Sequence, residues 1–284
     1  MKLGLIGFGY WGKILYKNLV ALKQDVVVCE PNPCPEDVRV IKDYKNIDVD
    51  AVFIAVPCRN HYDICKHFLE KNIPVFCEKP LTFTLEETKN LYDIANRKNT
   101  PLFVDWVFMY NQQVNKIKSI AQQGELGSLK TVSMRRLNKG PVRNDVNSLY
   151  DLSSHDLSIL FHVIGIDSPV NKICSQSYKA NYNSTQDDSF FGVYSIGSVV
   201  CTIQSSWEHA VKDRGCVFEF EKGVVCWDDM TQTLTIDGKP IIFHEKELPL
   251  VNSINAFLHT DVEQLSYQKE LTMNIMEILN NEIQ

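Results

Sequence analysis

The stretch LGLIGFGYWGKI at residues 3–14 decides the fold of the N-terminal half of the chain. Residues 3–6 form an apolar run typical of a short buried strand, and a helical pattern follows directly. Gly7, Gly9 and Gly12 have the G-x-G-x-x-G spacing, which permits a tight turn, a close approach of pyrophosphate to the backbone, and close helix–strand packing. Free N–H groups at the helix start would bind the phosphates. The residues expected at the cofactor here are Gly7, Phe8, Gly9, Tyr10, Trp11 and Gly12.

A second apolar strand, at residues 25–29, follows at βαβ distance and ends in Glu30. A carboxylate at that position can accept hydrogen bonds from both ribose hydroxyls of NAD and repels the 2′-phosphate of NADP. The next three residues, 31–33, supply no cation that would reverse this preference. The pattern therefore predicts a nicotinamide dinucleotide site that takes NAD rather than NADP.

Composition indicates a globular protein of about two domains: 284 residues, 32.5 kDa, 44% hydrophobic and 23% charged. The net charge of −6 and the absence of a Lys/Arg block argue against nucleic acid or a membrane surface as partner. The sequence has no apolar run of membrane-spanning length and no signal-peptide pattern. Nine cysteines without C-x-x-C spacing indicate reduced thiols in the cytoplasm rather than a zinc site, and no metal is expected.

Strand and helix patterns alternate up to about Asp105, which predicts a doubly wound parallel sheet of the Rossmann type. We expect strands at 51–55, 75–77 and 102–104, and helices at 62–71 and 84–98, the latter opened by a Thr84-x-x-Glu87 capping box. Ligands bind beyond the carboxyl ends of such strands. This adds to the expected cofactor-binding residues Ala55, Val56, Pro57, His61, Glu78 and Lys79.

The pattern changes after Asp105 and predicts a second, α+β domain with a large, open, mostly antiparallel sheet. A helix is expected at 113–123, closed by Gly124, and a final amphipathic helix runs from Glu263 to the end. Asp237-Gly238 is a hairpin turn signal. The predicted division is a dinucleotide-binding domain at 1–107 and a substrate-binding and oligomerisation domain at 108–284.

Lys79 follows the predicted strand at 75–77, where the nicotinamide ring should lie. Oxidation of a secondary alcohol needs a proton acceptor and a positive group for the developing oxygen charge, and an ammonium group suits the second role. A surface lysine in a strand–helix loop is the alternative. Pro80 is compatible with a cis peptide bond that fixes the direction of the lysine.

The segment YDLSSHD at residues 150–156 opens an amphipathic helical pattern that Gly165 ends. Asp151 and His155 are four residues apart and are expected on one helix face, where the carboxylate can orient the imidazole as a general acid/base. A capped structural histidine is the alternative. A phosphohydrolase-like metal site at His155-Asp156 lacks any second supporting His/Asp spacing.

The motifs GFGYWGK, AVPCRNH and CEKPLTFTLEE, with the acid at Glu30, resemble the glucose–fructose oxidoreductase, inositol dehydrogenase and MocA family. The similarity continues through DWVFMYNQQVNKIKSIAQQGELGSLK and GPVRNDVNSLYDLSSHDLSIL and, more loosely, through SSW at 205–207. It implies that His155 lies beside a substrate hydroxyl and that Asp151 shares the site. It also implies that one face of the second sheet serves as substrate floor and dimer contact.

Segments that should border the cleft contain Tyr110, Arg136, Arg143, Asn144 and Asn147. An arginine there can pair with a substrate diphosphate or carboxylate, and a solvated loop arginine is equally compatible. The residues expected to bind substrate are Lys79, Tyr110, Arg143, Asn144, Asn147 and His155.

The combined interpretation is an NAD-dependent sugar oxidoreductase in which Lys79, Asp151 and His155 are catalytic. The RNDVN…DLSSHD segment resembles members that act on sugars of nucleoside diphosphates, with the 3-hydroxyl as the reacting position. A homodimer or homotetramer through the second sheet is expected. The alternatives are a non-catalytic regulatory module that binds NAD and sugar, and a keto-sugar reductase that works in the opposite direction.

Overall fold

The computed structural model describes residues 1–35, 38–140, 142–244 and 248–282, which form two compact units. The first unit comprises Met1–Trp106 and Leu250–Asn280, and the second comprises Val107–Pro249 and Asn281–Gln284. The sequence-based division assigned everything after residue 107 to one domain. The structure instead groups the helical segment 250–280 with the N-terminal residues.

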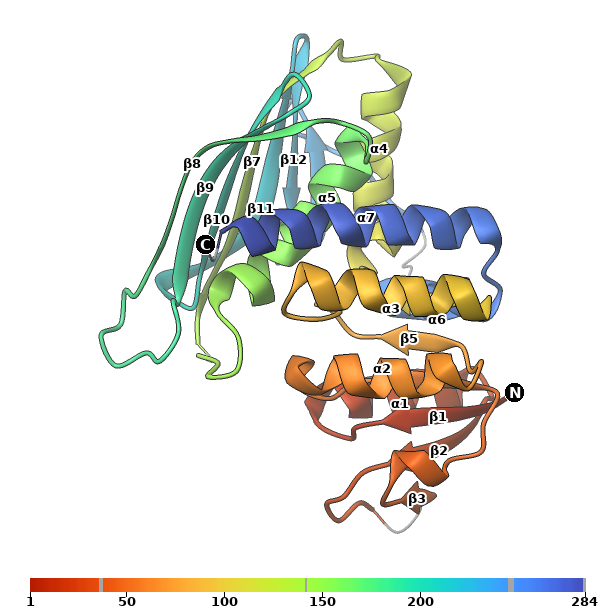
Figure 1. The fold of residues 1–284 in the computed structure, drawn as a ribbon. Coiled ribbons are helices and arrows are strands. Elements are labelled where there is room, and N and C mark those ends of the chain that lie inside the picture. The colour runs from red at the N-terminus through yellow and green to blue at the C-terminus, as the bar shows by residue number, and fades with distance from the viewer. Residues whose placement is uncertain (36–37, 141, 245–247, 283–284) are drawn as a thin grey trace. The chain divides into compact units, whose positions relative to one another are not determined.

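The first unit contains a six-stranded parallel sheet in the order β3-β2-β1-β4-β5-β6. Figure 1 labels β1, β2, β3 and β5 of this sheet. The strands are β1 Lys2–Ile6, β2 Asp25–Cys29, β3 Val40–Ile41, β4 Ala51–Ile54, β5 Val75–Cys77 and β6 Leu102–Val104. The helices are α1 Tyr10–Ala21, α2 His61–Glu70, α3 Leu85–Lys98, α6 Pro249–Leu258 and α7 Val262–Asn281, with short 3₁₀ turns η1 Tyr44–Asn46 and η2 Cys58–Asn60. The predicted Rossmann alternation is thereby confirmed.

The centre of this sheet is β1, which pairs with β2 on one side and β4 on the other. Ile6 is in register with both Cys29 and Ile54, so the three strands end at the same edge. The connections run in opposite directions from this point, which makes the edge a topological switch point where ligands bind.

Helix α6 covers the strands β4, β5 and β6 through the side chain of Phe257. Its ring packs against Phe53, Phe76 and Phe103 at centroid distances of 5.3, 5.6 and 5.7 Å. These strands are apolar throughout because they are buried on both faces. Helix α7 adds a hydrogen bond from the indole N–H of Trp106 to the Thr272 hydroxyl (2.9 Å).

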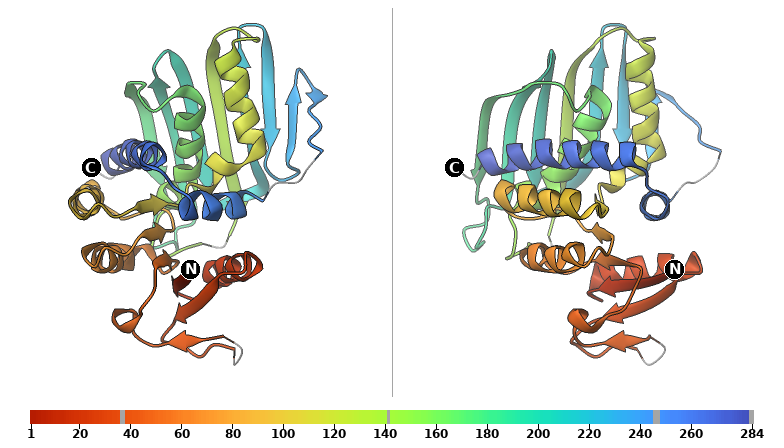
Figure 2. Two further views of the ribbon diagram at one scale, coloured as in Figure 1. Left: turned by 90° about the vertical axis from the view of Figure 1, so that its right-hand side faces the viewer. Right: turned by 45° about the vertical axis from the view of Figure 1, so that its right-hand side comes forward.

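The second unit is built on an eight-stranded sheet in the order β14-β13-β12-β11-β7-β10-β9-β8. Neighbours are antiparallel except β7 and β10, which pair in parallel, so the predicted mostly antiparallel sheet is confirmed. Figure 2 shows α4 and α5 on the same face of this sheet. The strands are β7 Leu129–Lys139, β8 Val170–Tyr178, β9 Ser189–Ile196, β10 Val199–Ser206, β11 Glu208–Phe220, β12 Gly223–Asp228, β13 Thr233–Ile236 and β14 Lys239–Pro240. The helices are η3 Val107–Tyr110, α4 Gln112–Gln123, the π-helical turn η4 Leu149–Ser153 and α5 Ser154–Ile164.

The predicted hairpin joins β13 and β14, and Asp237 and Gly238 both have positive φ, as its turn requires. The predicted C-terminal helix is α7, and residues 283–284 at its expected end lie outside the described part. Glu282, which belongs to the second unit, has a carboxylate that accepts hydrogen bonds from the hydroxyls of Tyr194 (2.7 Å) and Ser175 (2.5 Å). None of the helices in the described part combines the length and hydrophobicity needed to traverse a bilayer.

Candidate dinucleotide and catalytic sites

The glycine loop joins β1 to α1 in the first unit. Gly7 has φ +96°, and a Cβ placed there would lie 2.5 Å from the Ala55 carbonyl oxygen. A Cβ on Gly12 would collide with the carbonyl oxygen of Gly7, so both positions require glycine for packing. A Cβ on Gly9 would meet no protein atom within 4 Å. Gly9 therefore presents bare backbone to open space, as a pyrophosphate site requires.

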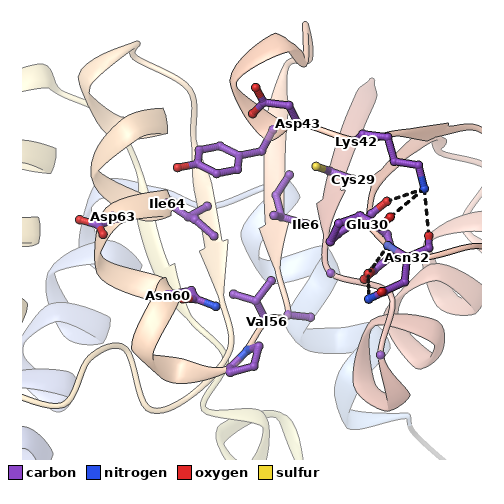
Figure 3. A pocket seen from close by; sticks show the side chains of 16 residues that line it. Ile6, Cys29, Glu30, Asn32, Lys42, Asp43, Val56, Asn60, Asp63 and Ile64 are labelled. Atoms are coloured by element: carbon purple, nitrogen blue, oxygen red, sulfur yellow. Dashed lines mark hydrogen bonds between the residues drawn. The ribbon is translucent and has the colours of Figure 1, made fainter.

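A cavity of about 570 Å³ opens beside this loop at the carboxyl ends of β1, β2 and β4 (Figure 3). This volume lies within the range typical of small-molecule and cofactor sites. The bare glycine backbone, the nearby helix N-terminus and the acid at the end of β2 fit a dinucleotide. The expected cofactor residues that line it are Gly7, Gly9, Glu30, Ala55, Val56 and Pro57. The expected residues outside its lining are Phe8, Tyr10, Trp11, Gly12, His61, Glu78 and Lys79.

Glu30 follows β2 and faces this cavity (Figure 3). One carboxylate oxygen accepts a hydrogen bond from the Phe8 N–H (2.9 Å), and the other accepts from the backbone N–H (3.0 Å) and side-chain amide (2.7 Å) of Asn32. Burial raises the pKa of Glu30, but these hydrogen bonds outweigh it and hold the pKa below its ordinary value. Glu30 is therefore an ionised, oriented acceptor.

Lys42, which the sequence reasoning missed, stabilises the loop after Glu30. Its ammonium group donates to the backbone carbonyl oxygens of Glu30 (3.3 Å), Pro31 (3.1 Å) and Asn32 (3.1 Å), as Figure 3 shows. Lys42 follows β3, and that two-residue strand pairs with β2. Pairing between these strands brings the lysine back to the loop although twelve positions separate it from Glu30.

His61 connects the loops that follow β4 and β5. It is 1% exposed, and its ring nitrogens lie 2.9 Å from the carbonyl oxygens of Val56 and of Pro80. His61 thus links the loop after β4 to the loop after β5, and it does not line the cavity.

Lys79 lies at the carboxyl end of β5, and the Lys79–Pro80 peptide bond is cis. Two carboxyl groups of the first unit, those of Glu78 and Asp105, interact electrostatically with its ammonium group. Asp105 was not predicted as a site residue. Its position directly after β6 was the available signal, because carboxyl ends of parallel strands meet at one edge.

Asp151 lies in the second unit, within the π-helical turn η4 that precedes α5. Single π-turns are rare and are frequent at functional sites. The Asp151 carboxylate accepts hydrogen bonds from the Arg143 guanidinium (3.1 Å) and from the indole N–H of Trp207 (3.3 Å). Asn147 caps this turn, because its side-chain carbonyl accepts from the Tyr150 N–H (2.9 Å).

His155 lies in the first turn of α5 and is half-buried. Its ring packs edge-on against Phe108 at a centroid distance of 5.2 Å. The same Phe108 ring lies 4.8 Å from the guanidinium carbon of Arg136 and 5.7 Å from the ring of Trp227. Phe108 and Trp227 were not predicted, since nothing in the local sequence links them to His155.

Arg136, expected in a segment that borders a substrate cleft, is itself buried. Its guanidinium forms ion pairs with Asp156 (2.9 Å) and Asp229 (3.2 Å). Burial lowers the pKa of Arg136, but the two carboxylates outweigh this and raise it. Arg136 thus pairs with one buried and one partly exposed carboxylate of its own unit.

Arg143 is 41% exposed in its side chain, and all three of its guanidinium nitrogens donate to carboxylates. Two of these bonds go to Asp145 (3.0 and 2.8 Å) and one goes to Asp151. Asn144 is exposed and accepts from the Thr185 hydroxyl (3.1 Å), and Tyr110 ends η3. The structure thus gathers Arg143 and Asn147 around Asp151.

Lys79 belongs to the first unit, and Asp151 and His155 belong to the second. Their joint action on one substrate stays a prediction. Across the ranges that the structure describes, no group of three or more His, Cys, Asp or Glu side chains is arranged to hold a metal ion.

The parallel sheet and the cavity at its strand ends define a Rossmann-type fold in the first unit. Residues 1–106 match the model of the Gfo/Idh/MocA oxidoreductase family with its NAD-binding Rossmann fold. The match confirms, for these residues, the resemblance carried by the glycine loop and the Glu78-Lys79-Pro80 motif, both of which lie within the matched range.

An uncharacterized oxidoreductase of Bacillus subtilis is 24% identical over 181 residues, which are 57% of this chain and 53% of the relative. The chain thus spans about half the length of this curated relative. UDP-N-acetylglucosamine 3-dehydrogenase from Acidithiobacillus ferrooxidans has a similar structure, with a TM-score of 0.80 and 16% identity over 100% of this chain and 99% of that one. A 3-ketoreductase from Actinomadura kijaniata, solved with TDP-benzene and NADP, has a TM-score of 0.82 and 16% identity over 99% and 96% of the chains. At these identities the structural similarity establishes the fold.

Proposed function

We propose that the protein is an NAD(H)-dependent oxidoreductase that moves a hydride between nicotinamide and a secondary alcohol or ketone of a sugar. The observation that carries this proposal is the position of Lys79. It follows β5 at the same carboxyl edge of the sheet as the glycine loop, Glu30 and the cavity. An ammonium group at that edge suits stabilisation of charge on a reacting oxygen.

NAD, when bound, supplies the hydride acceptor or donor. In the first unit Gly9 and the start of α1 bind the pyrophosphate, and Glu30 accepts from the adenosine ribose hydroxyls. Lys79 donates a hydrogen bond to the substrate oxygen at the reacting carbon. Charge developing on that oxygen in the transition state is thereby stabilised.

His155 takes the hydroxyl proton during oxidation and returns it during reduction. Asp151 supports the imidazolium that forms, and Arg143, Trp207 and Asn147 hold the turn that carries Asp151. Support for this assignment comes from the π-turn at Asp151 and from the family resemblance of the Asp151–His155 segment.

NAD is preferred over NADP in this proposal because Glu30 is ionised and held in place. A 2′-phosphate would be repelled by the carboxylate. Lys42 does not reverse this preference, since its three donors are directed to the carbonyl oxygens of residues 30–32.

The proposed substrate class is the nucleotide sugars, with reaction at the 3-position. A structural neighbour named as a UDP-sugar 3-dehydrogenase and another named as a 3-ketoreductase support this choice. The pair includes both reaction directions, so oxidation of the alcohol and reduction of the ketone are both to be tested.

The test is incubation of the purified protein with NAD⁺ and a panel of nucleoside-diphosphate sugars and free sugars, followed at the NADH absorbance. Keto-sugars with NADH form the reverse arm. Lys79→Met and His155→Ala should each lower turnover by roughly 10²–10⁴-fold. Tight NADH binding with no turnover of any sugar in either direction would support a regulatory binding module instead.

We also propose self-association through the face of the second sheet that α4 and α5 leave uncovered. Phe191 of β9 and Val200 of β10 are each 41% exposed there, and the register places them on one face. Sedimentation analysis should show a dimer or tetramer, and Phe191→Lys should shift it toward the monomer.

A further inference from the structure

Two acidic side chains of the first unit follow neighbouring strands at equivalent positions. Cys77 of β5 is in register with Val104 of β6, and Glu78 and Asp105 are the next residues along the two strands. The Asp105 N–H donates to the Cys77 carbonyl oxygen (2.9 Å), so the pairing continues to these residues. Residues in register on parallel strands point to the same face and are about 4.8 Å apart. The two carboxyl groups are therefore close neighbours.

The Asp105 carboxyl group is buried, that of Glu78 is partly buried, and both are incompletely hydrogen-bonded. Asp105 is 1% exposed, and one of its oxygens accepts from the Ser253 hydroxyl of α6 (2.6 Å). The other Asp105 oxygen and one oxygen of Glu78 are buried and have no hydrogen-bond partner among the described residues. A buried carboxylate that lacks hydrogen-bond donors rarely stays ionised, because burying an unpaired charge costs free energy.

Electrostatics in this cluster favour a bound proton. Burial raises the pKa of Asp105 to about 7, although Ser253 and Lys79 act in the opposite direction. Burial, and then the neighbouring Asp105 carboxylate, raise the pKa of Glu78 well above its usual range, against the effect of Lys79. The adjacent Cys77 thiol is neutral, since burial raises its pKa as well. Two carboxylates and one ammonium group leave one excess negative charge, and a single proton removes it.

We propose that Glu78 and Asp105 form a buried acid pair that shares one proton, and that its single remaining negative charge positions the Lys79 ammonium group. Ser253 orients Asp105 within the pair. This inference rests on the proposed function only in giving Lys79 a catalytic role. Glu78 and Asp105 are positioning residues, since they act through the lysine.

The test measures the charge of Lys79 directly. Competitive acetylation at pH 8, read by mass spectrometry at Lys79, reports the deprotonated fraction of the amine. Asp105→Asn and Glu78→Gln should each change the labelling rate by less than about threefold, because the remaining carboxyl group ionises and keeps one negative charge. The double variant removes that charge and should raise the rate roughly tenfold or more. Equal, additive increases of the labelling rate in the two single variants would mean that both carboxyl groups are ionised, which contradicts the shared proton. An unchanged labelling rate in the double variant would show that the pair has no effect on Lys79.

Thr100→Ala is the matched control, because Thr100 is buried in the same unit and its hydroxyl donates to the Lys98 carbonyl oxygen rather than to Glu78 or Asp105. It should leave the labelling of Lys79 unchanged. Infrared spectroscopy keeps the proposal testable if the double variant fails to fold. The wild-type protein should contain a protonated carboxyl group at pH 6, and Ser253→Ala should raise the pH at which its signal disappears. Absence of that signal, or an unshifted midpoint, overturns the proposal. Neither measurement needs NAD or sugar, so an enzyme inert toward every sugar would overturn the proposed function and leave this result standing.

Discussion

The indole N–H of Trp207 donates a hydrogen bond to the Asp151 carboxylate across 3.3 Å. Trp207 is 2% exposed and follows β10, whereas Asp151 lies in the turn before α5, so the sheet fixes one side of the proposed proton-transfer site. The Ser205 hydroxyl, on the same strand, contacts the Ser153 hydroxyl at 2.8 Å. The SSW segment, which matched the family only loosely, thus supports the turn that carries Asp151.

Trp207→Phe should lower kcat/KM roughly tenfold, because a hydrogen bond to a charged group is lost while the ring volume is largely kept. Trp227→Phe is the matched control. Trp227 is equally buried, and its indole nitrogen has no hydrogen-bond partner among the described residues. Steady-state kinetics measure kcat/KM of both variants, and melting temperatures check that both fold. Equal losses of activity in the two variants would contradict a role for the Trp207 hydrogen bond.

Gly9→Ala should fold normally and bind NADH at least tenfold more weakly. A methyl group at Gly9 meets no protein atom but extends into the space proposed for the pyrophosphate. Fluorescence titration measures the binding, and thermal melting checks the fold. Gly12→Ala should instead lower stability by about 1–3 kcal/mol, because its Cβ collides with the Gly7 carbonyl oxygen. Undiminished NADH binding by Gly9→Ala would place the pyrophosphate elsewhere.

Glu30→Ala should raise the ratio of kcat/KM for NADP to that for NAD by roughly tenfold or more. The variant loses the acceptor for the ribose hydroxyls and the repulsion of a 2′-phosphate. Both cofactors are compared under identical sugar saturation. An unchanged ratio would show that Glu30 does not discriminate between the ribose hydroxyls of NAD and the 2′-phosphate of NADP.

Lys42→Met should weaken NAD binding by about two- to fivefold, since the loop at residues 30–32 loses its three ammonium hydrogen bonds. Lys45→Met, an exposed lysine on η1, serves as control and should leave the affinity unchanged. Titration calorimetry provides both values. Equal effects of the two variants would indicate a general loss of charge rather than a loop contact.

His162 should make the protein sensitive to acid. Burial, with a smaller contribution from Lys118, lowers the pKa of His162 to about 3. The unfolded chain therefore binds a proton that the folded chain excludes, and stability falls as the pH drops from about 6.5 toward 3. His162→Gln should flatten the dependence of the melting temperature on pH in that window, and an identical dependence would contradict this assignment.

The sequence predicted the strands of the first unit closely because each is a short, fully apolar run between helical patterns. β2, β5 and β6 have the predicted bounds, and Thr84 caps α3 as the capping box required. β3 was missed because two residues carry no periodic signal, and its pairing with β2 depends on the sheet. Lys42 was missed because its position beside the loop after Glu30 depends on this pairing of β3 with β2.

Contacts across long sequence separations account for the rest of the site. Ser253 reaches Asp105 across 148 positions, and Trp207 reaches Asp151 across 56. No local propensity encodes such pairs, because packing of whole elements determines them. The catalytic assignment of Lys79, Asp151 and His155 came from motif resemblance and stays a prediction.

Phe257 on α6 completes the aromatic cluster of Phe53, Phe76 and Phe103. During synthesis, the first 106 residues leave the ribosome well before α6, the helix that covers their sheet, has been made. Until α6 emerges, three phenylalanine-bearing strands have an open hydrophobic side, which is where a chaperone would bind the nascent polypeptide. Excising the Rossmann segment at residue 106 would make that temporary exposure permanent, and a soluble cofactor-binding fragment must carry residues 250–280 with it.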